Sequence, residues 1–94
     1  MGEITWSDIA KENLRDIYDY IAKNSVRYAQ KEILKIDKRV KVLHSFPESG
    51  KIVPEYGKKN LRELIEGNYR IVYQLNADTS INIVSVHHHS KNLK

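Results

Sequence analysis

Residues 61–88 read LRELIEGNYRIVYQLNADTSINIVSVHH, and apolar residues recur along this stretch with a period of two. Such alternation is typical of strands, whose side chains point to opposite faces of a sheet in turn. Short polar turns divide the stretch, which predicts a three-stranded antiparallel meander. The predicted strands are 61–65, 69–75 and 81–88, and the turns between them are Gly67-Asn68 and residues 76–80.

Upstream of the meander the apolar period changes to that of a helix. Residues 3–6 predict a short strand, after which Ser7 is a helix N-cap and apolar residues continue at helical spacing to about Lys23. Ser25 can cap a second helix, and together the two predict a helical hairpin. The apolar face of the second helix is formed by Ala29, Ile33, Ile36, Val40 and Leu43.

The segment between the helices and the meander is predicted to be a loop over residues 46–60, since Pro47 and Gly50 interrupt the helical pattern. The resulting order is β-α-α-β-β-β. Helices followed by grouped strands predict an α+β fold in which the helical hairpin packs on one face of an antiparallel sheet. With 94 residues, the chain is expected to form a single domain, 1–94.

Composition indicates the cellular compartment in which the protein functions. It contains no cysteine, which excludes disulfides and thiolate metal sites and fits a reducing cytoplasm. No apolar run approaches the roughly 20 residues that span a bilayer, and the opening residues MGEITW lack the pattern of a signal peptide. We therefore expect a cytoplasmic protein that does not enter a membrane.

Charge is unevenly distributed along the chain. The net charge is +4, and residues 24–45 alone contain six bases and two acids. Basic charge favours an anionic partner, either nucleic acid or an acidic peptide, while a solvated helix face explains the same cluster without any partner.

An ordered set of short motifs covers nearly the whole chain. The motifs are Trp6-Ser7, Ile17-Tyr18-Asp19-Tyr20-Ile21, Ser25 with Tyr28-Ala29, Phe46 to Lys51, Pro54-Glu55, Leu61-Arg62-Glu63-Leu64, Tyr69 to Tyr73, and Val86-His87-His88 followed by Lys91 and Leu93. In this order and at these spacings the set resembles the RelE/ParE superfamily of toxins from type II toxin–antitoxin systems, and the loop FPESGKIVPE is closest to the ParE-like branch.

The resemblance implies the toxin component of a plasmid-stabilisation module, which arrests growth until a cognate antitoxin neutralises it in a hetero-oligomer. ParE-like toxins are thought to poison DNA gyrase through protein contacts, and we favour this target. The alternative is a RelE-like enzyme that cuts mRNA on the ribosome without a metal, so whether the chain is an enzyme stays open. We expect the chain to contact DNA only as part of the antitoxin complex. A non-toxic nucleic-acid-binding module is the third possibility.

Each mode of action assigns roles to particular residues. Metal-free RNA cleavage needs a base, a cation beside the phosphorane and an acid for the leaving oxygen. The catalytic candidates, which apply only to a ribonuclease, are Arg62, Arg70, His88 and Glu55. The candidates for contacts with the target or with nucleic acid are Lys51, Lys58, Lys59, Tyr56 and Lys91.

The remaining expectations concern exposure and cofactors. Arg62 and Arg70 are expected on the exposed face of the meander, and a surface ion pair with Glu63 or Glu66 is the simpler role for Arg62. Lys91 stands where the ParE-like branch usually has arginine, which keeps the charge but loses the planar fork. No cofactor is expected, and a metal site is not expected either, because successive histidines of a strand point to opposite faces, so that at most His87 and His89 share one.

Overall fold

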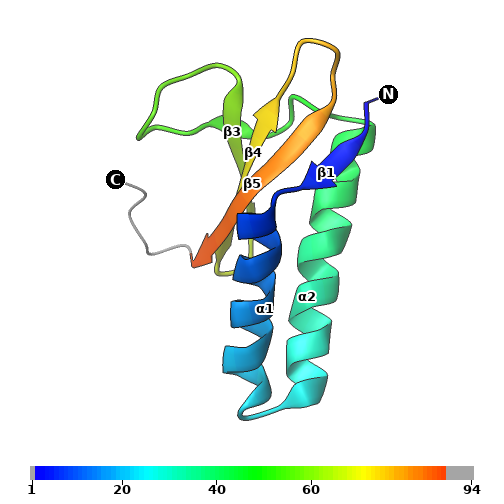
Figure 1. Ribbon diagram of the computed structural model, residues 1–94, viewed down its shortest axis with the longest axis vertical. Helices are drawn as coiled ribbons and strands as arrows, with labels where there is room; N and C mark the ends of the chain where they lie inside the picture. The colour runs from blue at the N-terminus through cyan, green and yellow to red at the C-terminus, as the bar shows by residue number, and fades with distance from the viewer. Residues whose placement is uncertain (1, 89–94) are drawn as a thin grey trace.

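The computed structural model describes residues 2–88, and its elements follow the predicted order with one short addition (Figure 1). The addition is strand β2, which lies within the segment that the sequence predicts to be a loop. The elements are β1 (Ile4–Trp6), α1 (Asp8–Ala22), α2 (Val26–Lys41), the 3-10 turn η1 (Val42–His44), β2 (Lys51–Ile52), β3 (Leu61–Glu66), β4 (Tyr69–Leu75) and β5 (Ile81–His88).

Both predicted helix caps are confirmed. The hydroxyl of Ser7 accepts a hydrogen bond from the backbone N–H of Ala10 at 3.0 Å, and that of Ser25 accepts one from Tyr28 at 3.0 Å. Each bond satisfies a backbone donor in the first helical turn that has no partner within the helix. The caps therefore fix where the two antiparallel helices begin. No helix within residues 2–88 combines the length and the apolar character needed to cross a membrane.

The strands form one five-stranded sheet in the order β1-β5-β4-β3-β2 (Figure 1). The α+β class and the C-terminal meander are confirmed, with β3, β4 and β5 antiparallel to one another. The sheet as a whole is mixed rather than antiparallel, because β1 pairs in parallel with β5, Ile4 lying opposite Ile81. A parallel pair needs a long crossover, which the helical hairpin and the strands after it provide.

The two helices cover one face of this sheet, and the main core lies between the layers. Apolar side chains of both layers are almost fully buried there, as the periodicity predicts. The cluster consists of Ala10, Ile36, Val40, Leu43, Leu64, Ile71, Tyr73, Ile81, Ile83 and Val86. The opposite face has buried residues of its own, including Val53 and Val72. The sheet therefore has a helix-covered face and a helix-free face.

The loop after η1 is fastened to the sheet through Tyr73. Its hydroxyl donates to the carbonyl of Pro47 at 2.8 Å and accepts from the N–H of Gly50 at 2.9 Å. A methyl group on Gly50 would lie 2.6 Å from the Tyr73 ring, closer than atoms can approach. Burial of the phenol raises the pKa of Tyr73, so the hydroxyl keeps its proton at neutral pH. The FPESG loop thus has one fixed position against the sheet.

Replacing Tyr73→Phe should lower the free energy of unfolding by about 1–3 kcal/mol, because the buried N–H of Gly50 loses its acceptor. Urea unfolding followed by circular dichroism measures this loss. The matched control is Tyr20→Phe, since the Tyr20 side chain is 74% exposed and its change should stay within about 0.5 kcal/mol. Equal stability of the two variants would contradict the fastening role of Tyr73.

Candidate functional site

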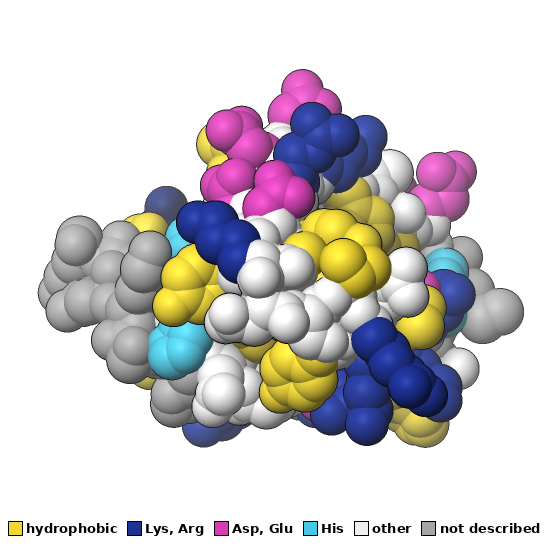
Figure 2. Space-filling model, turned by 90° about the horizontal axis from the view of Figure 1, so that it is seen from below, with side chains coloured by type: hydrophobic (Ala, Val, Ile, Leu, Met, Phe, Trp, Pro, Cys, Tyr) yellow, Lys and Arg dark blue, Asp and Glu magenta, His cyan; other side chains and the backbone are white. Residues whose placement is uncertain are grey.

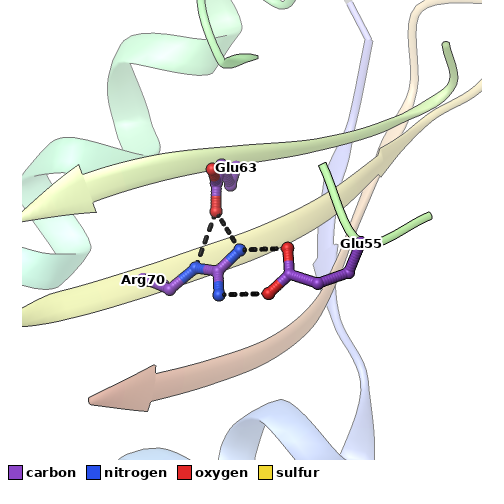
Figure 3. Close-up of polar contacts among 3 residues, drawn as sticks. All are labelled: Glu55, Glu63 and Arg70. Carbon is purple, nitrogen blue, oxygen red and sulfur yellow. Dashed lines mark hydrogen bonds and ion pairs between the residues drawn. The ribbon is translucent and has the colours of Figure 1, made fainter. Parts of the chain in front are cut away.

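The candidate site lies on the helix-free face of the sheet and is centred on Arg70 of β4. The antiparallel register places Ile65 of β3 and His87 of β5 directly opposite Arg70. Because alternate residues of a strand share a face, Glu63 also points to this side. Glu55, from the loop after β2, reaches the same guanidinium (Figure 3).

Arg70 binds two carboxylates at once (Figure 3). Its Nη1 lies 2.8 Å from Oε2 of Glu55 and its Nη2 lies 3.0 Å from Oε1, a parallel bidentate pair. Its Nε donates to Oε1 of Glu63 at 2.7 Å, and Nη2 contacts the same oxygen. Such forked, charge-assisted pairs are among the strongest polar contacts in proteins. The three residues, which we call the Arg70 cluster, join two strands and a loop.

Burial makes the charges of the Arg70 cluster interdependent. Arg70 is 8% exposed and Glu63 is 7% exposed, so both charges have lost most of their hydration. The hydrogen bonds that Arg70 donates to Glu55, aided by those to Glu63, raise the pKa of Arg70 further above its usual range despite the opposing effect of burial. One cation faces two carboxylates, so the cluster carries a formal charge of −1 when all three are ionised.

The expectation that Arg62 and Arg70 share the exposed face of the meander is wrong. Arg70 is buried, because Glu55 and Glu63 compensate its charge. Arg62 lies opposite Tyr73, and its guanidinium binds backbone carbonyls rather than a glutamate. These carbonyls belong to Glu48, Gly50 and Lys59, at distances of 3.2, 3.0 and 3.1 Å from the donating nitrogens.

His88 lies on the other face from Arg70. Its ring meets that of Tyr69 edge to face, with centroids 5.8 Å apart and an interplanar angle of 79°. Tyr69 packs against the main core on the helix-covered side. The predicted catalytic set is therefore divided, with Arg70 and Glu55 on the helix-free face and Arg62 and His88 on the helix-covered side.

Three of the predicted contact residues lie together in the segment after β2. Tyr56, Lys58 and Lys59 are all exposed, and Lys51 is exposed on β2 itself. Lys91 lies outside the described residues. Figure 1 shows this segment as a green loop that extends beyond the sheet edge. Tyr56 directly follows Glu55 of the Arg70 cluster in the chain, and Lys58 and Lys59 continue the same exposed segment.

Glu63 was predicted only as a possible surface partner of Arg62, and His87 was left out of the predicted catalytic set. For Glu63 the signal was present in the turn, because a two-residue turn at Gly67-Asn68 fixes the register of β3 against β4. That register places Glu63 and Arg70 on one face. Among residues 2–88, no group of three or more His, Asp or Glu side chains is placed to hold a metal ion.

Comparison with known proteins assigns the chain to a family. Residues 4–93 match the family model described as the ParE toxin of the type II toxin–antitoxin system, parDE. The match extends over almost the entire sequence, and the chain belongs to this family of toxins. A search of curated proteins finds no match.

Several solved structures share the fold of this chain. The chromosomal ParDE system from P. aeruginosa aligns with a TM-score of 0.75 at 22% identity, covering 94% of this chain and 96% of that one. The YoeB dimer from Staphylococcus aureus aligns with a TM-score of 0.62 at 24% identity, covering 94% and 97%. The RelBE2 toxin–antitoxin complex from Mycobacterium tuberculosis aligns with a TM-score of 0.59 at 19% identity, covering 93% and 96%. The two-layer architecture is thus common to this chain and these structures.

Removing the cation of the Arg70 cluster should lower the free energy of unfolding. In Arg70→Met two carboxylates stay close together without compensation, and we expect a loss of about 3–5 kcal/mol in the free energy of unfolding. Adding Glu55→Gln and Glu63→Gln to that variant should restore most of the loss. Urea unfolding measures both the loss and its restoration, and a loss below about 1 kcal/mol for Arg70→Met would contradict the arrangement.

Proposed function

We propose that the chain is a ParE-like toxin that arrests growth by poisoning DNA gyrase through protein contacts, not by cutting RNA. The observation that carries this proposal is the engagement of Arg70 by Glu55 and Glu63. Because gyrase is a cytoplasmic enzyme, the proposal also places the toxin in the cytoplasm.

Metal-free cleavage of RNA requires an available positive charge, which the Arg70 cluster does not provide. The phosphorane intermediate needs a cation that is available to it. Here the central cation is balanced by two carboxylates, so a phosphate approaching this face meets a net negative charge at short range. Arg62 is bound to backbone carbonyls, and His88 lies on the other side of the sheet. This division supports a toxin that acts by binding.

The contact surface for the target is proposed to lie on the loop beside the cluster. Lys51, Lys58 and Lys59 supply positive charge there, and Tyr56, which is 47% exposed, supplies an aromatic ring. Tyrosine is enriched at protein interfaces, where its ring adds apolar area and its hydroxyl adds a hydrogen bond. The Arg70–Glu55 pair holds this loop against the sheet, which gives the surface a defined shape.

The antitoxin is proposed to occupy a second surface. A groove runs between α1 and the adjoining ends of β4 and β5, and its lining includes Ile17, Tyr20, Ile21, Tyr69 and Val86. An extended or helical segment that folds on binding can bury these apolar side chains. Neutralisation then follows from wrapping of the toxin in a hetero-oligomer. The structures with the same fold include a ParDE toxin–antitoxin system and a RelBE2 toxin–antitoxin complex, which supports such a partner.

Pulse-labelling after tightly controlled induction in a sensitive bacterium tests the proposed target. DNA synthesis should fall within minutes while protein synthesis continues, and co-expression of the cognate antitoxin should abolish the effect. An initial fall in protein synthesis would instead establish the ribosome-dependent ribonuclease and return Arg62, Arg70, His88 and Glu55 to catalytic candidacy. Normal growth without antitoxin would contradict toxicity itself.

Neutralising two lysines of the loop should weaken the action on gyrase. For Lys58→Ala combined with Lys59→Ala, we expect a loss of about 1–2 kcal/mol, roughly a fivefold to thirtyfold rise in the concentration that half-inhibits supercoiling by purified gyrase. The matched control removes two exposed lysines of the α1 region, Lys11→Ala and Lys23→Ala. Equal inhibition by the two double variants would exclude the loop as the contact surface.

A further inference from the structure

The helical hairpin separates charge between its two helices. Helix α2 contains six bases and two acids, a net charge of +4, whereas α1 contains two bases and four acids, a net charge of −2. The whole chain also has a net charge of +4. The residues outside α2, with α1 included, therefore sum to zero, and the net positive charge of the chain equals that of α2. Figure 2 views the lower end of the molecule, where most Asp and Glu side chains gather at the top and a separate group of Lys and Arg lies at the lower right.

The bases of α2 form one exposed band along the helix. Arg27, Lys31, Lys38 and Lys41 follow a spacing of three, four or seven residues, which places them on one side of a helix, and Lys35 lies next to them. All five are exposed, while Ala29, Ile36 and Val40 of the same helix are buried against the sheet and α1. We call these five residues the α2 basic stripe. At 1.5 Å of rise per residue, it extends over about 21 Å.

Little within the described chain neutralises the α2 basic stripe. Lys35 lies 3.3 Å from Glu32 and Lys41 lies 3.0 Å from Asp37. Solvent-exposed pairs of this kind contribute little free energy, so a stronger anion can displace them. No ion pair observed between residues 2 and 88 involves Arg27, Lys31 or Lys38. Between three and five cations are therefore available to a partner.

We propose that the α2 basic stripe binds the phosphate backbone of duplex DNA. The length of the stripe matches the rise of about six base pairs, over which a duplex presents a dense row of charge. This contact is made by the toxin itself, in contrast to the expectation that DNA is met only through an antitoxin complex. The inference does not depend on gyrase as the target.

Residue types favour DNA over a protein partner or a single strand. Lysine, which supplies four of the five cations, binds phosphate as a point charge. The stripe encloses a single exposed apolar side chain, Leu34. Tyr28, which is 52% exposed, lies next to Arg27 at one end of the stripe, but a single ring does not provide the row of aromatic residues on which successive unpaired bases stack in single-stranded recognition. Contacts to phosphate alone predict binding without sequence preference.

Fluorescence anisotropy with the purified full chain and a labelled duplex of arbitrary sequence, about 24 base pairs long, tests the proposal at several salt concentrations. The logarithm of the association constant should fall linearly with the logarithm of salt, with a slope between about −2.7 and −4.5 for three to five phosphate contacts. Combining Arg27→Gln, Lys31→Gln and Lys38→Gln should make the slope less steep by about 2.7. The single variant Lys38→Gln should reduce it by about 0.9, which keeps the test valid if the triple variant folds poorly.

The control removes the same types of charge from the α1 region, by Lys11→Gln, Arg15→Gln and Lys23→Gln. This variant should keep most of the DNA affinity and nearly the full salt slope. Equal losses in both triple variants would mean that only net charge matters, which overturns the proposal. Unchanged DNA binding in the stripe variants, or a loss confined to binding of the antitoxin, would overturn it as well.

Discussion

The arrangement of the helix-free face depends on the ion pairs between Arg70 and the carboxylates of Glu55 and Glu63. Two carboxylates this close together repel each other, and burial deprives them of the water that would otherwise screen them. One guanidinium with a forked geometry resolves this conflict, and it does so only if the loop, β3 and β4 are all in place. The cluster therefore fixes the position of the loop, whereas an apolar contact, which is not directional, would define that position less closely.

The two faces of the sheet consequently hold the molecule together by different means. Packing of aliphatic side chains unites the helices with the helix-covered face, and this contact tolerates small shifts of its members. Directional polar contacts dominate elsewhere, where the Arg70 cluster fixes one loop and the hydroxyl of Tyr73 and the guanidinium of Arg62 fix another. The backbone of these two loops, which carry exposed side chains, is therefore held in one position.

Periodicity and capping residues were sufficient to predict the α+β fold, both helices and the meander, since each depends on local sequence. Strand β2 was missed because two residues carry no periodic signal. The parallel pairing of β1 and the burial of Arg70 were missed because both depend on partners distant in the sequence. The roles of Arg62, Arg70, His88 and Glu55 follow from chemistry that only a functional test can assign, although the structure does determine which of them share a face.

Because the first strand pairs with the last, the sheet is completed only late in synthesis. Ile4 and Ile81 are neighbours in the sheet, so β1 cannot join it until β5 has been made. Long-range pairing of this kind is slow to form and leaves strand edges open in the meantime. Until β5 has been made, a nascent toxin therefore lacks its completed sheet, and a partner already present can meet it before its fold is closed.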